Sequence, residues 1–208
     1  MNGYFISFEG GEGAGKSTQI SYLNEYLTRQ GHAVLVTRQP GGTVYGKKIR
    51  ELILSPDEHE SLSARAELFL YLADRAHHVD TVIQPALEQG QIVICDRYAD
   101  STLAYQGYGR QLDLTELKTL NQLATSGLQP GLTIWLDIEP MAGRERILGR
   151  QALDRLEQEG LSFHQRVRDG YLDLSRQEPW RWRRLDASQS EVVLQNQIQD
   201  LVNQLLSS

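Results

Sequence analysis

The sequence contains little cysteine and no long apolar run, and both absences narrow the kind of protein it can be. Only Cys95 is a cysteine among the 208 residues, so the chain cannot form an internal disulfide. No apolar run approaches the length that a helix needs to cross a bilayer. The N-terminus also lacks the charged and apolar regions of a secretory signal. We therefore expect a cytoplasmic protein without a membrane partner.

Positive charge is also scarce. The chain has 21 lysines and arginines against 27 acidic residues, which gives a net charge of -6 at pH 7. A nucleic-acid-binding surface needs clustered positive charge, so we expect no nucleic-acid partner. Apolar residues make up 40% of the chain, which is enough for the core of one domain of this length. The sequence shows no repeat or linker, so residues 1–208 are predicted to form a single domain.

A glycine-rich segment near the N-terminus matches the phosphate-binding loop pattern, in which a glycine and four further residues precede Gly-Lys-Ser. An apolar run precedes it and a helical pattern follows it, which is the context that the pattern requires. Glycines let backbone N–H groups point at anionic oxygens, and the following helix adds its positive end. Lys16 is expected to reach the β- and γ-phosphates, and Ser17 to bind Mg²⁺. The residues predicted to bind a nucleoside triphosphate here are Gly10, Gly11, Glu12, Gly13, Ala14, Gly15, Lys16, Ser17 and Thr18.

Short apolar runs alternate with helical patterns along the chain. This alternation predicts an α/β fold of three layers, the P-loop NTPase fold, with a five-stranded parallel sheet covered by helices on both faces. Ligands of such sheets bind beyond the carboxyl ends of the strands. Strands are expected at 4–8, 34–37, 92–95, 132–137 and 182–186. Helices are expected at 17–30, 45–54, 62–89, 113–126, 140–149, 160–177 and 189–206.

Two charged residues follow the third expected strand, where the ligand of such a sheet would lie. Asp96 is placed to hold Mg²⁺ directly or through water, and Arg97 can bind a phosphate with its planar set of donors. For an isolated dipeptide, an Asp-Arg pair that merely closes a strand is the simpler interpretation. The neighbouring phosphate-binding loop favours the functional one, so Asp96 and Arg97 are predicted to be catalytic together with Lys16.

The combination of segments resembles the bacterial thymidylate kinases. Members of that family transfer a phosphoryl group from ATP to dTMP and give dTDP, in dTTP biosynthesis. The resemblance extends along the whole chain in the family's order, and it implies ATP and Mg²⁺ as cofactors, direct in-line transfer and a homodimer. The matching segments are residues 8–19, 37–43, 96–98 with Ser101, 104–107, 136–137 with Pro140, 154–157 and 186–189.

The resemblance also implies roles for individual residues in binding dTMP. Phe69 matches the ring that stacks on thymine, and Tyr105 matches a ring set against the sugar, where it would crowd a ribose 2′-hydroxyl. Thr102 and Gln106 match positions that hydrogen-bond the base, and Arg75 matches a residue near the base and the phosphate. Residues implied to bind the monophosphate are Arg50 and Arg97, with Glu12 near the 3′-hydroxyl. One position departs from the family, which usually has Arg-Glu-Pro-Gly-Gly where this chain has Gln39, so no carboxylate role is expected there.

An arginine-rich segment at about 144–158 is interpreted as a mobile lid over the triphosphate. A solvated helix face with ion pairs is the alternative for such a run. Some family members place an arginine in the phosphate-binding loop, but this chain has Gly13 there, so the lid is expected to supply the charge that stabilises the transferring group. Arg150 is the first candidate for this catalytic role and Arg155 the second. Residues expected near the adenine are Arg144, Ala187 and Ser188, with Arg146 there or on the surface.

Two other functions remain open on the residues alone. One is a kinase of the same fold that acts on another pyrimidine monophosphate or on a deoxynucleoside. The other is a GTPase or ATPase switch that makes no product, although the chain lacks the Asn-Lys-x-Asp pattern by which many GTPases read guanine. A phosphoryl-transfer assay that depends on the acceptor distinguishes a kinase from a switch.

Overall fold

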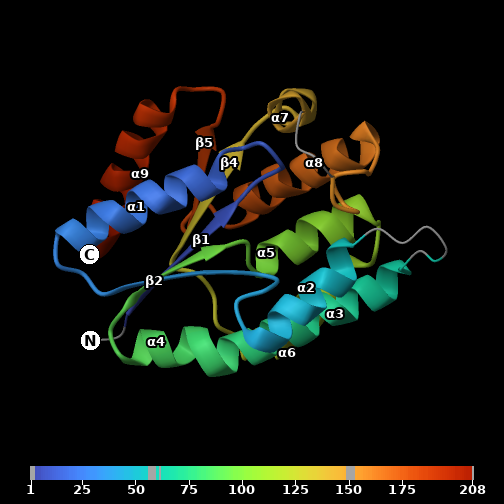
Figure 1. The fold of residues 1–208 in the computed structure, drawn as a ribbon, viewed down its shortest axis with the longest axis horizontal. Coiled ribbons are helices and arrows are strands. Elements are labelled where there is room, and N and C mark those ends of the chain that lie inside the picture. The colour runs from blue at the N-terminus through green and yellow to red at the C-terminus, as the bar shows by residue number, and fades with distance from the viewer. Residues whose placement is uncertain (1–2, 56–59, 61, 149–152, 208) are drawn as a thin grey trace.

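The computed structural model of the chain describes residues 3–55, 60, 62–148 and 153–207. Five strands and the helices around them follow one another in the alternating order that the sequence predicts (Figure 1). The strands are β1 (Tyr4–Glu9), β2 (Val34–Arg38), β3 (Ile92–Asp96), β4 (Leu132–Asp137) and β5 (Trp182–Asp186). The helices are α1 (Lys16–Arg29), α2 (Val44–Leu54), α3 (Ala64–His78), α4 (Gln84–Glu88), α5 (Ala99–Thr102), α6 (Leu114–Thr125), α7 (Pro140–Ile147), α8 (Leu161–Gln177) and α9 (Glu191–Leu206), with two π-helical turns, η1 (Val79–Ile83) and η2 (Leu103–Gly109).

All strand pairs are parallel, and the order across the sheet is β2-β3-β1-β4-β5. Strand β1 lies at the centre, so the loop that follows it opens in the middle of the carboxyl edge. The loops after β2 and β3 reach the same edge, because parallel strands end on the same side. The predicted fold, a parallel five-stranded sheet between helices, is therefore confirmed.

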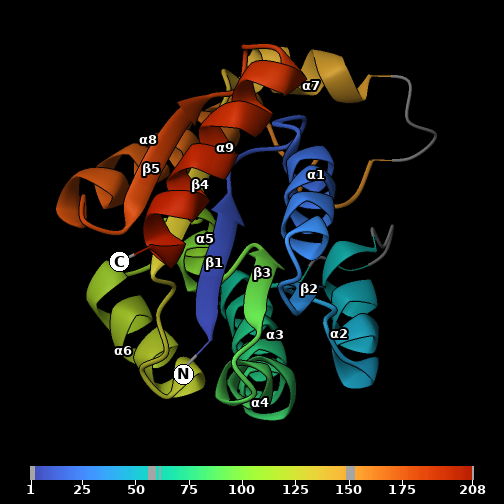
Figure 2. The same ribbon diagram turned by 90° about the vertical axis from the view of Figure 1, so that its left-hand side faces the viewer.

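Alternate side chains of the strands build separate cores on the two faces of the sheet, since successive strand residues point to opposite sides. Ile6 and Phe8 of β1 pack with α1 and α9, which lie side by side on one face (Figure 2). Phe5 packs on the other face with η1 and α4. The core that carries Trp135 of β4 also lies on this face, and it joins α3, η2, α6 and α8. Both faces are covered, as the apolar character of the strands requires.

Several helices begin at the polar residue that the sequence offers for capping. The side chain of Thr43 accepts a hydrogen bond from Gly46 N before α2, and Ser63, Asp113 and Ser190 do the same before α3, α6 and α9. The expected helix over 62–89 is interrupted, because α3 ends at His78 and the π-helical turn η1 leads into α4. Pro85 explains the wider turn, since it has no N–H and its ring clashes with the preceding turn of an α-helix.

Residues 99–109 form α5 and η2, a helical segment that the local sequence pattern does not predict. It contains Gly107 and Gly109, which disfavour a helix by propensity. Its contacts explain why it is helical, because η2 packs closely against α8, and a Cβ on Gly109 would lie 2.7 Å from the Phe163 ring. Tertiary packing therefore outweighs local preference here. Across the described residues, no helix is both long and apolar enough to cross a membrane.

Candidate functional site

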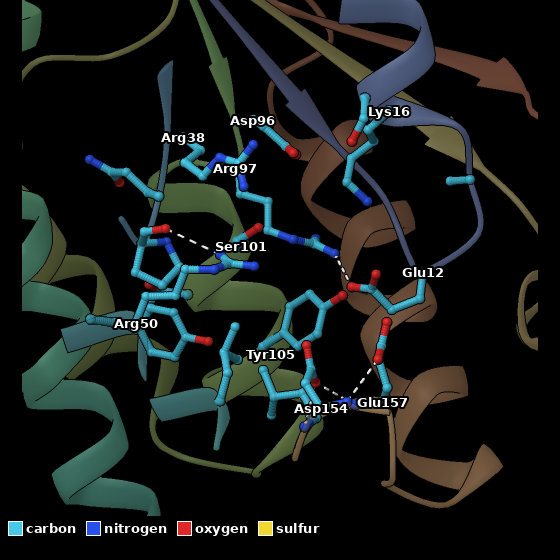
Figure 3. Close-up of a pocket in the computed structure, with 18 of the residues that line it drawn as sticks. Glu12, Lys16, Arg38, Arg50, Asp96, Arg97, Ser101, Tyr105, Asp154 and Glu157 are labelled. Atoms are coloured by element: carbon cyan, nitrogen blue, oxygen red, sulfur yellow. Dashed lines mark hydrogen bonds and ion pairs between the residues drawn. The ribbon is translucent and has the colours of Figure 1, made fainter. Parts of the chain in front are cut away.

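A cavity of about 520 Å³ opens at the carboxyl edge of the sheet (Figure 3). The phosphate-binding loop lines one side, and the loop after β2 lines another. The ends of β3, α2, α3 and η2 contribute further side chains, together with Asp154, Leu156 and Glu157 of the segment that precedes α8. The sheet topology therefore brings together the polar residues that follow the first three strands, as the sequence analysis expects.

The phosphate-binding loop is shaped by glycines at positions that other residues would not tolerate. Gly10 has a φ of 139°, and a Cβ there would lie 2.4 Å from the carbonyl oxygen of Leu136. Lys16 is buried, and its Nζ donates to the carbonyl oxygens of Gly10 and Gly11 at 3.0 and 2.9 Å. Burial and the nearby charge of Arg97 lower the pKa of the Lys16 amine. The lysine is thus held against the loop whose phosphate ligand it is predicted to meet.

Asp96 and Ser17 both line the cavity and carry oxygen atoms that a cation could bind. Oδ1 of Asp96 is buried and has no hydrogen-bond partner among the described residues. Ser17 is exposed in the first turn of α1. Within the described part of the chain, no group of three or more His, Cys, Asp or Glu side chains could hold a metal. One carboxylate with one hydroxyl suits Mg²⁺, which keeps several waters and shares phosphate oxygens instead of needing a full protein cage.

Arg97 projects into the middle of the cavity from the end of β3 (Figure 3). Its φ of 67° lies in the left-handed region, which is uncommon outside glycine, and its N–H donates to Phe8 O at 2.9 Å. The guanidinium pairs with Glu12, donates to Gly10 O at 2.8 Å, and lies 5.0 Å from the centre of the Tyr105 ring. Burial opposes ionisation of Glu12, but Arg97 and Lys16 outweigh it and lower its pKa to about 2.

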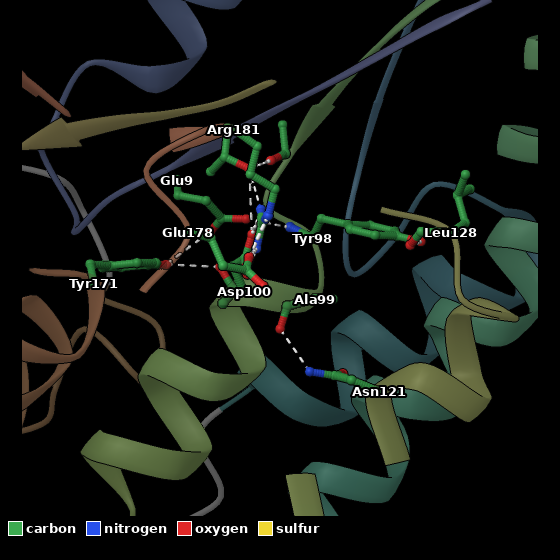
Figure 4. A network of polar contacts seen from close by, with 12 residues as sticks. Glu9, Tyr98, Ala99, Asp100, Asn121, Leu128, Tyr171, Glu178 and Arg181 are labelled. Carbon is green, nitrogen blue, oxygen red and sulfur yellow. Dashed lines mark hydrogen bonds and ion pairs between the residues drawn. The ribbon is translucent and has the colours of Figure 1, made fainter. Parts of the chain in front are cut away.

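A buried network of polar contacts surrounds Glu9 at the end of β1, and no local sequence pattern predicts it (Figure 4). Glu9 is fully buried and accepts hydrogen bonds from Tyr98 N at 2.8 Å, Ser101 Oγ at 2.5 Å and Tyr171 Oη at 3.0 Å. Burial and the charge of Asp100 raise the pKa of Glu9 to about 7. The available signal was a carboxylate at the end of an otherwise apolar strand. Its partner Tyr171 is 162 residues away, which no local pattern reveals.

Arg75 reaches the cavity from α3 and joins three parts of the site. It is 1% exposed, and its Nε donates to Gln39 Oε1 at 2.9 Å. Its other nitrogens donate to Thr102 Oγ1 at 2.8 Å, Asn121 Oδ1 at 2.9 Å and Tyr98 O at 3.1 Å. Gln39, where the resemblance implies a glutamate, is therefore part of this network.

The other residues expected to bind dTMP are mostly brought to the cavity. Arg50, Thr102, Tyr105 and Gln106 line it, and Arg50 also donates to Pro40 O at 3.2 Å. Phe69 is the exception, because it does not line the cavity and its side chain is 58% exposed.

The aromatic ring that α3 presents to the cavity belongs to Tyr71. Positions two apart on an α-helix point in nearly opposite directions, so Phe69 and Tyr71 cannot both face the cavity. Tyr71, and not Phe69, is therefore the α3 aromatic residue that lines the cavity, and the contact of Phe69 with the base stays a prediction. The signal that could have found Tyr71 was the spacing to Arg75, since Tyr71 lies one helical turn before it.

The expected adenine-side residues lie around the phosphate-binding loop and the end of β5. Arg146 donates to Gly13 O at 3.3 Å and to Ala187 O at 2.9 Å, so α7 is tied to both. Arg144 lines a smaller hollow next to the main cavity. Ser188 is exposed and follows the buried Ala187.

The expected lid is only partly within the described chain. Arg150 lies outside the described residues. Arg155 is described, and its guanidinium donates to Ile53 O at 2.7 Å and pairs with Glu67. It does not line the main cavity, so the structure does not bring this second candidate to the phosphate-binding loop.

Comparisons with family models, curated sequences and solved structures all point to the same family. A family model described as thymidylate kinase matches residues 8–198. A thymidylate kinase of Acaryochloris marina is 49% identical, with 99% of this chain and 98% of that protein covered. One from a Synechococcus species is 56% identical over 89% of this chain and 87% of the relative. The crystal structure of a thymidylate kinase from Ehrlichia chaffeensis superposes with a TM-score of 0.78 at 32% identity, covering 97% of this chain and 99% of that one.

Proposed function

This chain belongs to the thymidylate kinase family and phosphorylates dTMP to dTDP with ATP as the donor, and we propose that both substrates meet in the cavity at the carboxyl edge of its sheet. The observation that carries the proposal is the convergence of Lys16, Asp96 and Arg97 on one cavity that also holds Tyr105 and Gln106. Charged groups for phosphates and polar groups for a base thus line one continuous space.

The donor half of the cavity is the phosphate-binding loop with its neighbours. Residues 10–18 are proposed to hold the triphosphate through backbone N–H groups, with Lys16 on the β- and γ-phosphates. Ser17 and Asp96 would hold Mg²⁺, which when bound neutralises charge between the phosphates. Arg144, Ala187 and Ser188 are proposed to flank the adenine.

The acceptor half is the side formed by α2, α3 and η2. Arg97 and Arg50 are proposed to bind the dTMP phosphate, and Glu12 to approach the 3′-hydroxyl. Tyr105 is proposed to pack against the sugar, where it leaves little room for a 2′-hydroxyl. The proposed base contacts are Arg75, Thr102 and Gln106, with the ring of Tyr71 against thymine.

The proposed reaction is direct in-line transfer. The attacking atom is a dTMP phosphate oxygen, which is already largely ionised near neutral pH, so the site needs no strong general base. Asp96 then acts through Mg²⁺ and position instead of removing a proton. The transferring group needs positive charge, which Lys16, Arg97 and the lid residue Arg150 are proposed to supply.

The organisation of the protein is proposed on family membership and on the fold. The chain is proposed to act as one domain whose segment at about 144–158 closes over ATP and excludes water. It is also proposed to work as a homodimer in the cytoplasm, without nucleic-acid or membrane partners.

The test is coupled ADP release from ATP·Mg²⁺ with dTMP, dUMP, UMP, dCMP and thymidine as separate acceptors. Fast release with dTMP and much slower release with dUMP supports the proposed base site. Faster turnover with another acceptor would move the specificity while keeping the fold. Release that is the same with every acceptor would contradict the proposed transfer.

A further inference from the structure

Glu67 is a buried carboxylate that the proposed mechanism does not use. It lies in the first turn of α3, and its side chain is 0% exposed. Arg110 donates to its two oxygens at 3.4 and 3.1 Å, and Arg155 pairs with Oε2. Gln106 Nε2 donates to Oε1 at 2.7 Å. Of these three partners, Gln106 is the one that also lines the main cavity.

The contact with Glu67 determines which way the Gln106 amide faces. An ionised carboxylate only accepts hydrogen bonds, so the amide must turn its nitrogen toward Glu67. Burial raises the pKa of the Glu67 carboxyl, but the hydrogen bonds from Gln106, Arg110 and Arg155 outweigh burial and keep its pKa below the usual range. Glu67 is therefore ionised at neutral pH, and the opposite orientation of the amide would set two acceptors against each other.

The rest of the amide is available to a ligand. Among the described residues, no side chain or backbone group donates to Gln106 Oε1. Because Gln106 lines the cavity, a carbonyl acceptor and one remaining N–H donor are what its amide can offer to a base. In a nucleotide, thymine carries one N–H donor, N3–H, next to carbonyl acceptors. Cytosine has the reverse pattern, because its N3 accepts and its 4-amino group donates. The amide as oriented complements thymine, and the same amide turned over would complement cytosine.

We propose that Glu67 is a positioning residue that sets the preference for thymine over cytosine by fixing the orientation of the Gln106 amide. The inference rests on the proposed function, because it takes Gln106 as a residue that faces the base. Arg110 and Arg155 take part indirectly, since they hold the carboxylate in place and ionised. Recognition of the base then depends on the Glu67 carboxylate, although Glu67 itself does not contact the base.

The experiment compares two acceptors that share the sugar, the phosphate and the 5-methyl group. They are dTMP and 5-methyl-dCMP, which differ at N3 and at the 4-position. Glu67→Gln removes the charge and offers Gln106 either a donor or an acceptor, so the amide can turn. We expect the ratio of kcat/KM for dTMP over 5-methyl-dCMP to fall by about tenfold or more, mainly through KM. The wild-type chain is measured first, in the same coupled assay.

Two further variants make the result decisive. Glu67→Asp keeps a charge near Arg110 but shortens the side chain by one methylene, so the contact with Gln106 is lost and the base preference should fall as well. Arg110→Gln is the matched control. It removes one of the two ion pairs of Glu67, and Arg155 still holds the carboxylate against Gln106, so the variant should lower thermal stability without changing the preference.

Each outcome has one meaning. An unchanged preference in folded Glu67→Gln overturns the inference. If that variant does not fold, Glu67→Asp decides in the same way. An equal loss of preference in Arg110→Gln also overturns it, because a general loosening would then be the cause. A wild-type enzyme that ignores dTMP would instead contradict the proposed function itself.

Discussion

The guanidinium of Arg97 pairs with the carboxylate of Glu12, so the end of β3 is tied to the middle of the phosphate-binding loop. The pair lies in the main cavity between the sides assigned to the two nucleotides (Figure 3). Arg97 also lies against the ring of Tyr105, which limits where the guanidinium can point. A residue proposed to bind the acceptor phosphate is thereby positioned by the donor loop.

Arg97→Lys tests whether this geometry matters beyond charge. Lysine keeps the positive charge but lacks the planar set of donors that reaches Glu12, Gly10 O and a phosphate together. We expect kcat/KM for dTMP to fall by about 10²-fold or more, as when a preorganised donor is lost. Steady-state kinetics with dTMP checks this, and Arg29→Lys, on an exposed ion pair, is the control. Wild-type kinetics in Arg97→Lys would mean that charge alone suffices.

Tyr71→Ala tests whether the aromatic ring that lines the cavity is the one that meets the base. Loss of a ring that stacks on a base costs about 1–3 kcal/mol, so KM for dTMP should rise about 5- to 150-fold. Tyr71→Phe keeps the ring and should stay close to wild type. Phe69→Ala is the matched comparison, since Phe69 is 58% exposed and does not line the cavity. A larger effect from Phe69→Ala than from Tyr71→Ala would restore the original expectation.

Asp96→Asn tests the proposed magnesium site. The amide keeps the shape of the side chain and loses the charge that a hard cation prefers. We expect the Mg²⁺ concentration for half-maximal activity to rise about tenfold, the size of effect of losing one charged ligand interaction. A titration of MgCl₂ at fixed ATP measures it. Asp80→Asn, at an exposed carboxylate in η1, should leave the titration unchanged.

Glu9 predicts a pH dependence of stability. Its pKa is raised from 4.5 to about 7 by burial and by Asp100, so the folded chain binds more protons than the unfolded chain between these values. Its contribution to the free energy of unfolding is therefore full below about pH 4.5 and is lost as the pH rises through about 7.

Urea unfolding between pH 5 and 8 measures the Glu9 effect. The side chain at position 9 of Glu9→Gln does not titrate. The free energy of unfolding of the wild type minus that of the variant should therefore fall as the pH rises. The comparison by difference also removes the opposite contribution of His78, whose pKa is lowered to about 4 by burial and by Arg75. A difference that does not change over this range would contradict the raised pKa.

Replacing the two candidate lid arginines should have different effects, one on kcat and the other on thermal stability. Arg150→Ala should lower kcat by about 10³-fold if this side chain stabilises the transferring group. Arg155→Ala should mainly lower the melting temperature, because Arg155 is held by Glu67 and Ile53 O. Single-turnover rates and thermal melts of both variants measure the two effects. A drop in kcat below tenfold for Arg150→Ala would reject its assigned role.

The sequence predicted most of the fold because its evidence is local. Apolar runs of strand length, the helical patterns between them and the spacing of the phosphate-binding loop each act within a few residues. The helical segment at 99–109 was missed for the converse reason. Its glycines have a low helix propensity. Their role becomes clear only from the packing, because a Cβ on Gly109 would collide with the ring of Phe163.

The features of the site also fall into those that local sequence predicts and those that depend on long-range packing. The sequence by itself determined the phosphate-binding loop, the Asp96-Arg97 pair and the family, because these are runs of adjacent residues whose chemistry is readable in order. Only the tertiary structure decided that Tyr71 and not Phe69 lines the cavity, that Glu9 meets Tyr171, and that Glu67 accepts a hydrogen bond from Gln106. Each of these depends on which side of a helix or strand meets a distant part of the chain. Packing between distant segments determines which side faces inward, and no single segment of the sequence specifies that packing.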